Sequence, residues 1–158
     1  MLDKQRGYWH SAELLTAARM AEAGFVVSVP LIPVRYDLIG DRDGCIVRVQ
    51  VKRAKWREQR TKPTGRGDRA CWSVVLTRRR DKAGSKRLHE RLAVKDFDYL
   101  AVMCTFQDVY FIPSGALTGD DGVLLRTLQI KPPDASNKRA DATQAGQRWE
   151  SYRNRFEV

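Results

Sequence analysis

Residues 36–52 read YDLIGDRDGCIVRVQVK, and this stretch restricts the possible folds more than any other in the chain. Two runs of β-forming residues flank a DRDG segment, which is typical of a β-hairpin. Alternate residues of a strand share a face, so the valines at 47, 49 and 51 lie on one side while Gln50 and Lys52 lie on the other. The sequence therefore predicts a hairpin with one apolar and one polar face.

The length of the hairpin turn decides which residue faces Gln50. A two-residue Asp43–Gly44 turn puts Asp37 directly opposite Gln50. A four-residue Asp41–Gly44 loop puts Asp37 opposite Arg48 and diagonal to Gln50. In both registers the carboxylate and the carboxamide share one face of the hairpin.

These side chains have the chemistry of a metal site. A carboxylate (Asp37) beside an amide oxygen (Gln50) suits Mg²⁺, and the strand carbonyl of Val51 supplies a third oxygen. Lys52 on the same face can orient water or stabilise charge on a phosphate. Glu13, on a preceding helix, leans toward the protein and is a further candidate ligand.

The rest of the sequence predicts a single domain over residues 1–158 in which strands and helices are mixed. A helix is expected over 10–24, with Ser11 as its N-cap and Gly24 as its stop. A closing helix is expected over 144–156. Besides the hairpin, strands are expected over 25–32, 71–78, 98–106, 108–113 and 123–130. This order indicates an α/β or α+β fold with a mixed β-sheet.

Positive charge is concentrated in one quarter of the chain. The net charge is +10, and residues 53–91 alone carry 14 Lys and Arg against four acidic residues. Two basic loops, at about 53–70 and 78–91, are therefore expected to bind a nucleic-acid backbone. Within this region Trp56 can either stack on a base or cover the core. The candidate DNA-binding residues are Arg53, Lys55, Arg57, Arg60, Lys62, Arg66, Arg69, Arg78, Arg79 and Arg80.

Several classes of protein are disfavoured by what the sequence lacks. No apolar run is long enough to span a membrane, and the first residues have no signal-peptide pattern. Three cysteines without CxxC spacing indicate a reduced, cytoplasmic protein with buried thiols. Two histidines are too few for a three-His zinc site, and there is no phosphate-binding glycine loop.

Asp37 followed by Gln50-Val51-Lys52, after a helix bearing Glu13, resembles the PD-(D/E)XK nuclease superfamily, and in particular its group I intron homing endonuclease branch. DFDYLAVM followed by VYFIP resembles the later strand pair of that branch, and Trp149 fits the inward Trp of its closing helix. The chain departs from the superfamily motif in having Tyr36 for proline and Gln50 for the second acid, although the homing branch shares this glutamine.

The resemblance implies a restriction-endonuclease-like core, a mixed β-sheet flanked by helices. It implies phosphodiester hydrolysis in double-stranded DNA with Mg²⁺, for which Mn²⁺ can substitute. Asp37, Gln50, Val51 and Glu13 are then the metal ligands, and Lys52 completes the catalytic set with Asp37, Gln50 and Glu13. A homodimer or homotetramer is also implied. The exposed apolar residues considered for its interface are Tyr110, Phe111, Trp149 and Phe156, for which a core role is the alternative.

Two other functions are compatible with the sequence. A structure-selective nuclease of the Holliday-junction type would share the fold and the site. A non-catalytic nucleic-acid-binding module with a decayed nuclease fold would bind with steep salt dependence and cut nothing.

Overall fold

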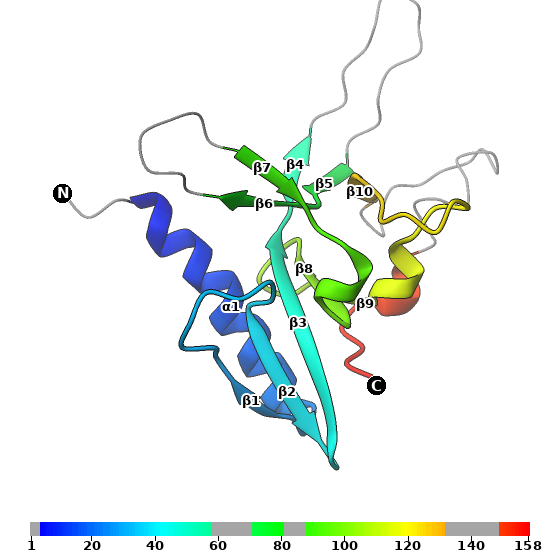
Figure 1. Ribbon diagram of the computed structural model, residues 1–158. Coiled ribbons are helices and arrows are strands. Elements are labelled where there is room, and N and C mark those ends of the chain that lie inside the picture. Colours follow the sequence, from blue (N-terminus) through cyan, green and yellow to red (C-terminus); the bar gives the residue numbers. More distant parts are fainter. Residues whose placement is uncertain (1–3, 58–70, 81–87, 132–148) are drawn as a thin grey trace, which may run out of the picture.

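The computed structural model describes residues 4–57, 71–80, 88–131 and 149–158 (Figure 1). One α-helix, α1 (Lys4–Glu22), opens the described chain. The strands are β1 (Val26–Ser28), β2 (Leu38–Arg42), β3 (Cys45–Arg53), β4 (Lys55–Arg57), β5 (Cys71–Val75), β6 (Thr77–Arg80), β7 (Leu88–Arg91), β8 (Tyr99–Met103), β9 (Val109–Pro113) and β10 (Thr127–Ile130). Short 3₁₀ helices are η1 (Val94–Asp96), η2 (Ser114–Leu117) and η4 (Glu150–Tyr152).

The main sheet has five strands in the order β1-β2-β3-β8-β9. β3 and β8 are parallel and the other neighbours are antiparallel, so the predicted mixed sheet is confirmed. β3 then leaves this sheet at the buried Ala54, and the chain continues as β4 into a second sheet of order β10-β5-β4. One continuous stretch of chain therefore belongs to both sheets, as Figure 1 shows.

Helix α1 covers one face of the main sheet. Its buried residues Ala12 and Met20 are eight positions apart, a little over two helical turns, so they lie on the same side of the helix. They pack in one cluster with the three valines of β3. The contact is so close that a Cβ on Gly40 of β2 would lie 2.5 Å from Cε of Met20 and 2.9 Å from Cδ1 of Phe25, which explains the glycine. The helix ends at Glu22, and Gly24, with a φ of +90°, is its stop as predicted. It begins at Lys4, so the predicted N-cap at Ser11 is wrong.

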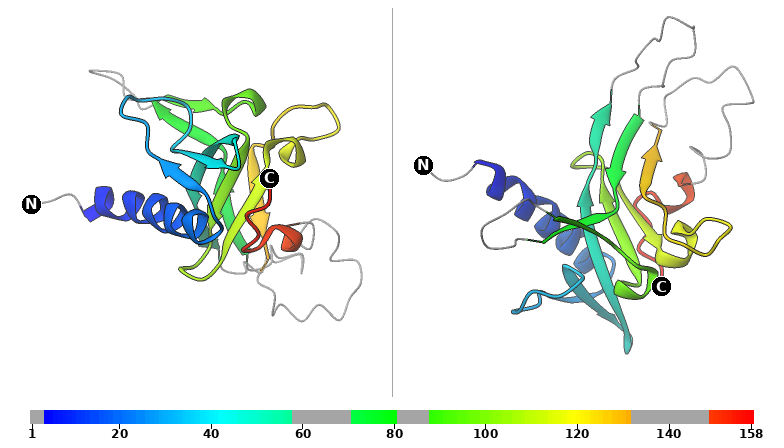
Figure 2. Two further views of the ribbon diagram at one scale, coloured as in Figure 1. Left: turned by 90° about the horizontal axis from the view of Figure 1, so that it is seen from below. Right: turned by 45° about the horizontal axis from the view of Figure 1, so that its top comes forward.

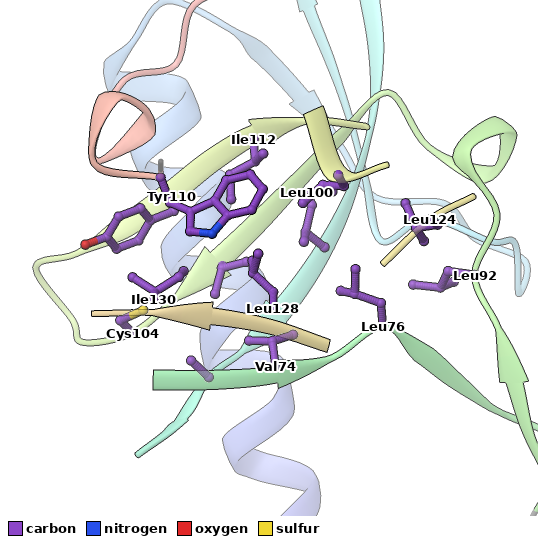
Figure 3. Packing of buried hydrophobic residues seen from close by; sticks show 14 of the residues in the cluster. Val74, Leu76, Leu92, Leu100, Cys104, Tyr110, Ile112, Leu124, Leu128 and Ile130 are labelled. Atoms are coloured by element: carbon purple, nitrogen blue, oxygen red, sulfur yellow. The ribbon is translucent and has the colours of Figure 1, made fainter. Parts of the chain in front are cut away.

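The opposite face of the main sheet is covered by the second sheet, as the view from below in Figure 2 shows. Leu128 and Ile130 of β10 and Val74 of β5 pack onto Leu100 and Tyr110 of the main sheet, and Figure 3 shows this cluster from close by. A mixed sheet flanked by helices was predicted. Among the described residues one α-helix flanks one face only, because short alternating strands supply the apolar cover of the other.

Two further predicted elements differ from the structure. The described part of the predicted closing helix, from Trp149 onward, contains only the short η4, although Trp149 itself is 3% exposed and thus inward as expected. The second basic loop contains the strands β6 and β7, which pair as an antiparallel hairpin. Strand β4 lies in the first basic loop, and residues 58–70 and 81–87 are outside the described residues.

The residues considered for an oligomer interface belong to the core. Tyr110, Phe111, Trp149 and Phe156 are each at most 7% exposed within one chain, so the interface prediction is wrong for them. The core alternative holds, because Phe111 stacks on Tyr99 with ring centroids 4.4 Å apart.

The structure shows which cysteines are buried and whether any described helix could cross a membrane. Cys71 and Cys104 are buried, and burial raises the pKa of the Cys104 thiol to about 12, whereas Cys45 is exposed and so departs from the prediction. No helix in the described ranges has the length and apolar character needed to cross a membrane.

Candidate active site

The register of the β2–β3 hairpin brings two predicted site residues together. The turn consists of Asp43–Gly44, whose φ angles of 55° and 81° are of the sign that a two-residue type I′ turn requires at both positions. It sets Leu38 opposite Val49, and the N–H of Asp37 donates to the carbonyl of Val49 at 2.9 Å. The two-residue alternative is correct, and Asp37 lies opposite Gln50.

Asp37, Gln50 and Val51 form one hydrogen-bonded cluster. Oδ2 of Asp37 accepts the backbone N–H of Val51 at 2.7 Å and a second hydrogen bond from Nε2 of Gln50. The same Nε2 donates to the carbonyl oxygen of Val51 at 3.3 Å. Gln50 is 5% exposed and Asp37 is half-buried. Three of the four predicted metal ligands therefore meet at one point where β2 begins.

The donor chemistry of this cluster fits a hard divalent cation. A half-turn of the Gln50 carboxamide about its last bond exchanges Nε2 and Oε1, which brings the amide oxygen to the Asp37 carboxylate and the Val51 carbonyl. Three oxygens of different kinds are then available to one ion. No group of three or more His, Cys, Asp or Glu side chains with metal-binding geometry occurs in the described residues. A site here consequently depends on the amide and the backbone as well as on carboxylates.

Lys52 lies on β3 with Gln50, whereas Glu13 lies on α1, the helix that packs on the valine face of the sheet. Lys52 is half-buried on β3, two residues after Gln50 and on the same face by strand alternation, next to Val102 of β8 in the register. Glu13 is half-buried on α1 and follows Ala12, which is buried in the cluster that contains the three valines of β3. Their roles remain predictions.

An ion pair fixes β3 against the start of β8. Arg48 donates from Nε to Oδ2 of Asp98 at 3.0 Å and from Nη2 to Oδ1 at 2.8 Å, a two-pronged contact. The backbone N–H of Arg48 also donates to Oδ2, at 2.7 Å, and the N–H of Asp98 donates to the carbonyl of Arg48 at 2.8 Å. These hydrogen bonds from Arg48 lower the pKa of Asp98. The strand that carries Gln50 is thereby held by side chain and backbone two residues before the site.

A second ion pair holds the segment that leads into Asp37. Nη1 of Arg35 donates to both oxygens of Asp96 at 3.2 Å, and Nη2 donates to Oε1 of Glu90 at 3.2 Å. The Asp96 side chain is 4% exposed and also accepts the N–H of Ala93 at 2.8 Å. Arg35 thus joins the β1–β2 connection to η1 and to β7.

Sequence reasoning missed these two arginine contacts. Arg48 was placed on the polar face with Gln50, yet its partner lies 50 residues further along the chain. Arg35 and Asp96 are 61 residues apart. A single sequence contains no signal for pairings at such distances, because hydrophobic periodicity reports only which face a residue occupies.

The candidate DNA-binding residues are described only in part. Lys55 and Arg57 are exposed on β4, and Arg53 is half-buried at the end of β3. Trp56 between them is 44% exposed and contacts Trp72 edge to face, with ring centroids 5.1 Å apart, so it covers part of the second sheet. Arg78, Arg79 and Arg80 lie in β6, where only the backbone is described. Arg60, Lys62, Arg66 and Arg69 lie outside the described residues.

The described sheet is mixed, with Asp37 just before one hairpin strand and Gln50-Val51-Lys52 in the next. The family model of PD-(D/E)XK endonucleases matches residues 1–150, and the chain belongs to this family. Family membership implies phosphodiester hydrolysis.

A solved structure supports the fold. The bacterial homing endonuclease I-Ssp6803I is similar with a TM-score of 0.67 and 20% sequence identity over 96% of this chain and 89% of that chain. The resemblance to PD-(D/E)XK nucleases that the sequence predicted is confirmed, and the fold is restriction-endonuclease-like. A structure described as MepB is similar with a TM-score of 0.46 and 16% identity over 89% of this chain and 93% of that one. No curated protein matches the chain by sequence.

Proposed function

We propose that this protein is a Mg²⁺-dependent DNA endonuclease of the homing type, which cuts double-stranded DNA at a specific site. The observation that carries the proposal is the convergence of the Asp37 carboxylate, the Gln50 carboxamide and the Val51 carbonyl in a chain of the PD-(D/E)XK endonuclease family. The similarity in fold to a bacterial homing endonuclease supports the finer assignment.

Each residue of the site has a distinct task in this proposal. Asp37, Gln50 and Val51 hold the cation through their oxygens, and Glu13 serves as a further ligand or anchors one of its waters. When bound, Mg²⁺ supplies positive charge for the phosphate and lowers the pKa of a coordinated water. Mn²⁺ can take its place. Lys52 orients the attacking water and stabilises the negative charge that develops on the phosphate.

Lys55, Arg57 and the other basic candidates hold the DNA backbone beside the site. The whole excess of +10 lies within residues 53–91, which contain these basic candidates. Contacts with DNA phosphates give affinity that does not depend on the base sequence. Because one domain with one site cuts one strand at a time, a double-strand break requires two copies on opposite strands. We therefore include a homodimer or homotetramer in the proposal.

The test is cleavage of a randomised duplex library in Mg²⁺, with mapping of the new ends. Wild-type protein should cut a defined sequence, and Asp37→Ala and Lys52→Ala should each lower the single-turnover rate by at least about 100-fold. Both variants should bind the duplex with nearly unchanged Kd, because most of the affinity comes from distant phosphate contacts. Lys55→Ala, on the neighbouring basic strand, is the control that should weaken binding and leave the rate at saturating protein unchanged.

Several outcomes would contradict the proposal. Full activity in Asp37→Ala or Lys52→Ala would show that the site is elsewhere. Cleavage of four-way junctions but of no linear duplex would indicate the structure-selective alternative. Salt-dependent binding without any cleavage in Mg²⁺ or Mn²⁺ would indicate a non-catalytic module.

A further inference from the structure

Arg35 occupies an unusual place in this fold. It lies two residues before Asp37, in the connection between β1 and β2, where the described residues 29–36 form no helix or strand. Ladder pairing resumes only with the N–H of Asp37. Asp37 is bound to β3 on one side, through the N–H of Val51 and the side chain of Gln50, and on the other side its position depends on what holds this connection.

The guanidinium of Arg35 provides that hold on one side. Both oxygens of Asp96 lie 3.2 Å from Nη1, and Asp96 is a buried carboxylate that is itself hydrogen-bonded to the N–H of Ala93. A buried charge is strongly bound to its partner, since separating the two leaves it uncompensated. Arg35 is thus tied to a buried carboxylate at the end of η1.

On the other side, Arg35 reaches the basic hairpin. Its Nη2 donates to Glu90 of β7, and Glu90 is the register partner of Arg78 in β6. Arg78 begins the Arg78–Arg80 run that is proposed to contact DNA. One side chain consequently joins the segment before Asp37, a fixed point of the core and the strand pair proposed to bind DNA.

We propose that Arg35 is a positioning residue of the nuclease site, which makes the placement of Asp37 depend on the β6–β7 hairpin. DNA held against the hairpin stabilises the arrangement in which Glu90 and Arg35 are paired, and Asp37 is then held in register with Gln50. This inference rests on the proposed function, because it assigns Arg35 a task in that same site.

The experiment compares Arg35→Ala, Arg35→Lys and Glu90→Gln with wild type on the mapped duplex. Arg35→Ala should lower the rate at saturating protein by about 10-fold or more and raise the Mg²⁺ concentration for half-maximal cleavage. Its duplex Kd, measured in a Lys52→Ala background, should stay within about threefold. Arg35→Lys should restore part of the rate, because a lysine keeps the charge but lacks the fork that reaches two carboxylates. Glu90→Gln removes only the charge of the hairpin contact, and it should lower the rate by roughly 2- to 30-fold.

Two controls separate positioning from folding. Arg19→Ala removes another partly exposed arginine, paired with Glu22 at 3.0 Å on α1, and should cut at the wild-type rate. If Arg35→Ala alone is unstable, Arg35→Ala with Asp96→Asn removes the unpaired buried charge, and the folded double variant should keep the lowered rate. Affinity for Mn²⁺, measured by electron paramagnetic resonance without DNA, should fall in Arg35→Ala and remain unchanged in Arg19→Ala.

The outcomes distinguish this inference from the proposed function. Wild-type protein that neither cuts DNA nor binds Mn²⁺ would defeat the proposed function and, with it, the task of Arg35. Wild-type protein that cuts, while folded Arg35→Ala cuts at the same rate with the same Mg²⁺ requirement, would overturn the inference alone. An equal loss in Arg35→Ala and Arg19→Ala would also overturn it.

Discussion

Gln50 has a property that the acid of the family's motif lacks. Its carboxamide donates a hydrogen bond to the Asp37 carboxylate through one end and offers an oxygen through the other. A glutamate in this place would set two carboxylates against each other without a metal, and like charges at this range repel. The glutamine therefore lets the buried site fold without a cation and still accept one.

We expect Gln50→Glu to be less stable than wild type without metal, because a satisfied hydrogen bond is replaced by repulsion. The cost should be about 1–3 kcal/mol, which lowers Tm by several degrees in a domain of this size. Added Mg²⁺ should raise Tm more in Gln50→Glu than in wild type, since its ligand is charged. Gln50→Ala should show little Mg²⁺ response and should cleave least. Differential scanning calorimetry with and without MgCl₂ measures these differences.

Gln129→Glu is the matched control, because Gln129 is exposed on β10 and far along the chain from the site. It should melt like wild type with and without metal. A Gln50→Glu variant as stable as wild type in the absence of Mg²⁺ would contradict the role given to the carboxamide.

The facing pair Asp37 and Gln50 was predictable because both residues lie on one hairpin, where turn length and strand alternation determine register. The hydrogen bonds from Gln50 and Val51 to Asp37 follow from that register. The supports from Arg35 and Arg48 were not predictable, since they join segments that only the completed sheet brings together.

At the scale of elements, the pairing of β3 with β8 depends on Arg48 and Asp98. The two strands are parallel, and their connection passes through the second sheet and the β6–β7 hairpin, so no tight turn sets their register. The two-pronged ion pair lies where this pairing starts, one residue before Tyr99 meets Val49.

Low pH should weaken the ion pair between Arg48 and Asp98. The pKa of Asp98 is lowered in the fold, chiefly by the hydrogen bond from the Arg48 side chain. Its contribution to the free energy of unfolding is therefore complete above about pH 4, the unfolded value, and is lost as pH falls through the lower folded value. Asp98→Asn should be less stable at pH 7 by about 0.5–1 kcal/mol, a range suited to a partly exposed pair, and the difference should shrink toward pH 3. Urea denaturation at the two pH values measures it.

Asp120→Asn, which changes an exposed aspartate elsewhere, should leave the urea midpoint unchanged at pH 7. A gap between wild type and Asp98→Asn that is equally large at both pH values would mean that the Asp98 charge does not stabilise the fold.

Elements with a clear pattern of apolar residues were predictable from the sequence, and elements without such a pattern were not. Helix α1 and the β2–β3 hairpin have apolar residues at helical or alternating spacing, and strands β8 and β9 are continuous apolar runs. All four were predicted. Strands β6 and β7 contain mostly charged residues, so their pairing was not apparent. The segment after Trp149 has helical spacing, but its residues pair with β9 instead. Asn154 donates its N–H to the Val109 carbonyl at 2.7 Å, and tertiary contacts override propensity there.

At the scale of the whole molecule, the two edges of the main sheet differ. The β9 edge is covered by the chain's own last described residues, since Arg153 bridges to Tyr110 and Asn154 pairs with Val109. The β1 edge has β2 as its one strand neighbour in the described sheet, and Val26 is 72% exposed there. Residues 23–34 contain no charged side chain. In a chain of net charge +10, such a surface is where two copies meet with least repulsion.

We therefore predict that the oligomer required for a double-strand break forms through the β1 edge, with a second copy continuing the sheet. Val26→Lys should be more monomeric than wild type. A lysine on an edge strand opposes pairing, and two like charges that face each other across the interface cost several kcal/mol. Val123→Lys, at an exposed valine in a loop, should behave like wild type. Light scattering coupled to size-exclusion chromatography, with and without duplex, measures the masses.

Val26→Lys should also still nick one strand while losing the double-strand cut. A wild-type monomer that makes double-strand breaks in both states, or a Val26→Lys variant that stays oligomeric, would refute this assembly.

The parallel pairing of β3 with β8 has a consequence for the timing of activity during synthesis. All four side chains proposed for catalysis lie within residues 13–52, so they are synthesised before the strand that pairs with β3 in parallel. The strand that completes the pairing of β3 begins only at Tyr99, and Asp98, which anchors Arg48, comes just before it. A nascent chain that already contains every group proposed for catalysis thus still lacks the strand that holds them in place. Translation therefore has to continue well past the last of these groups, as far as β8, before the proposed site can be held in its final arrangement.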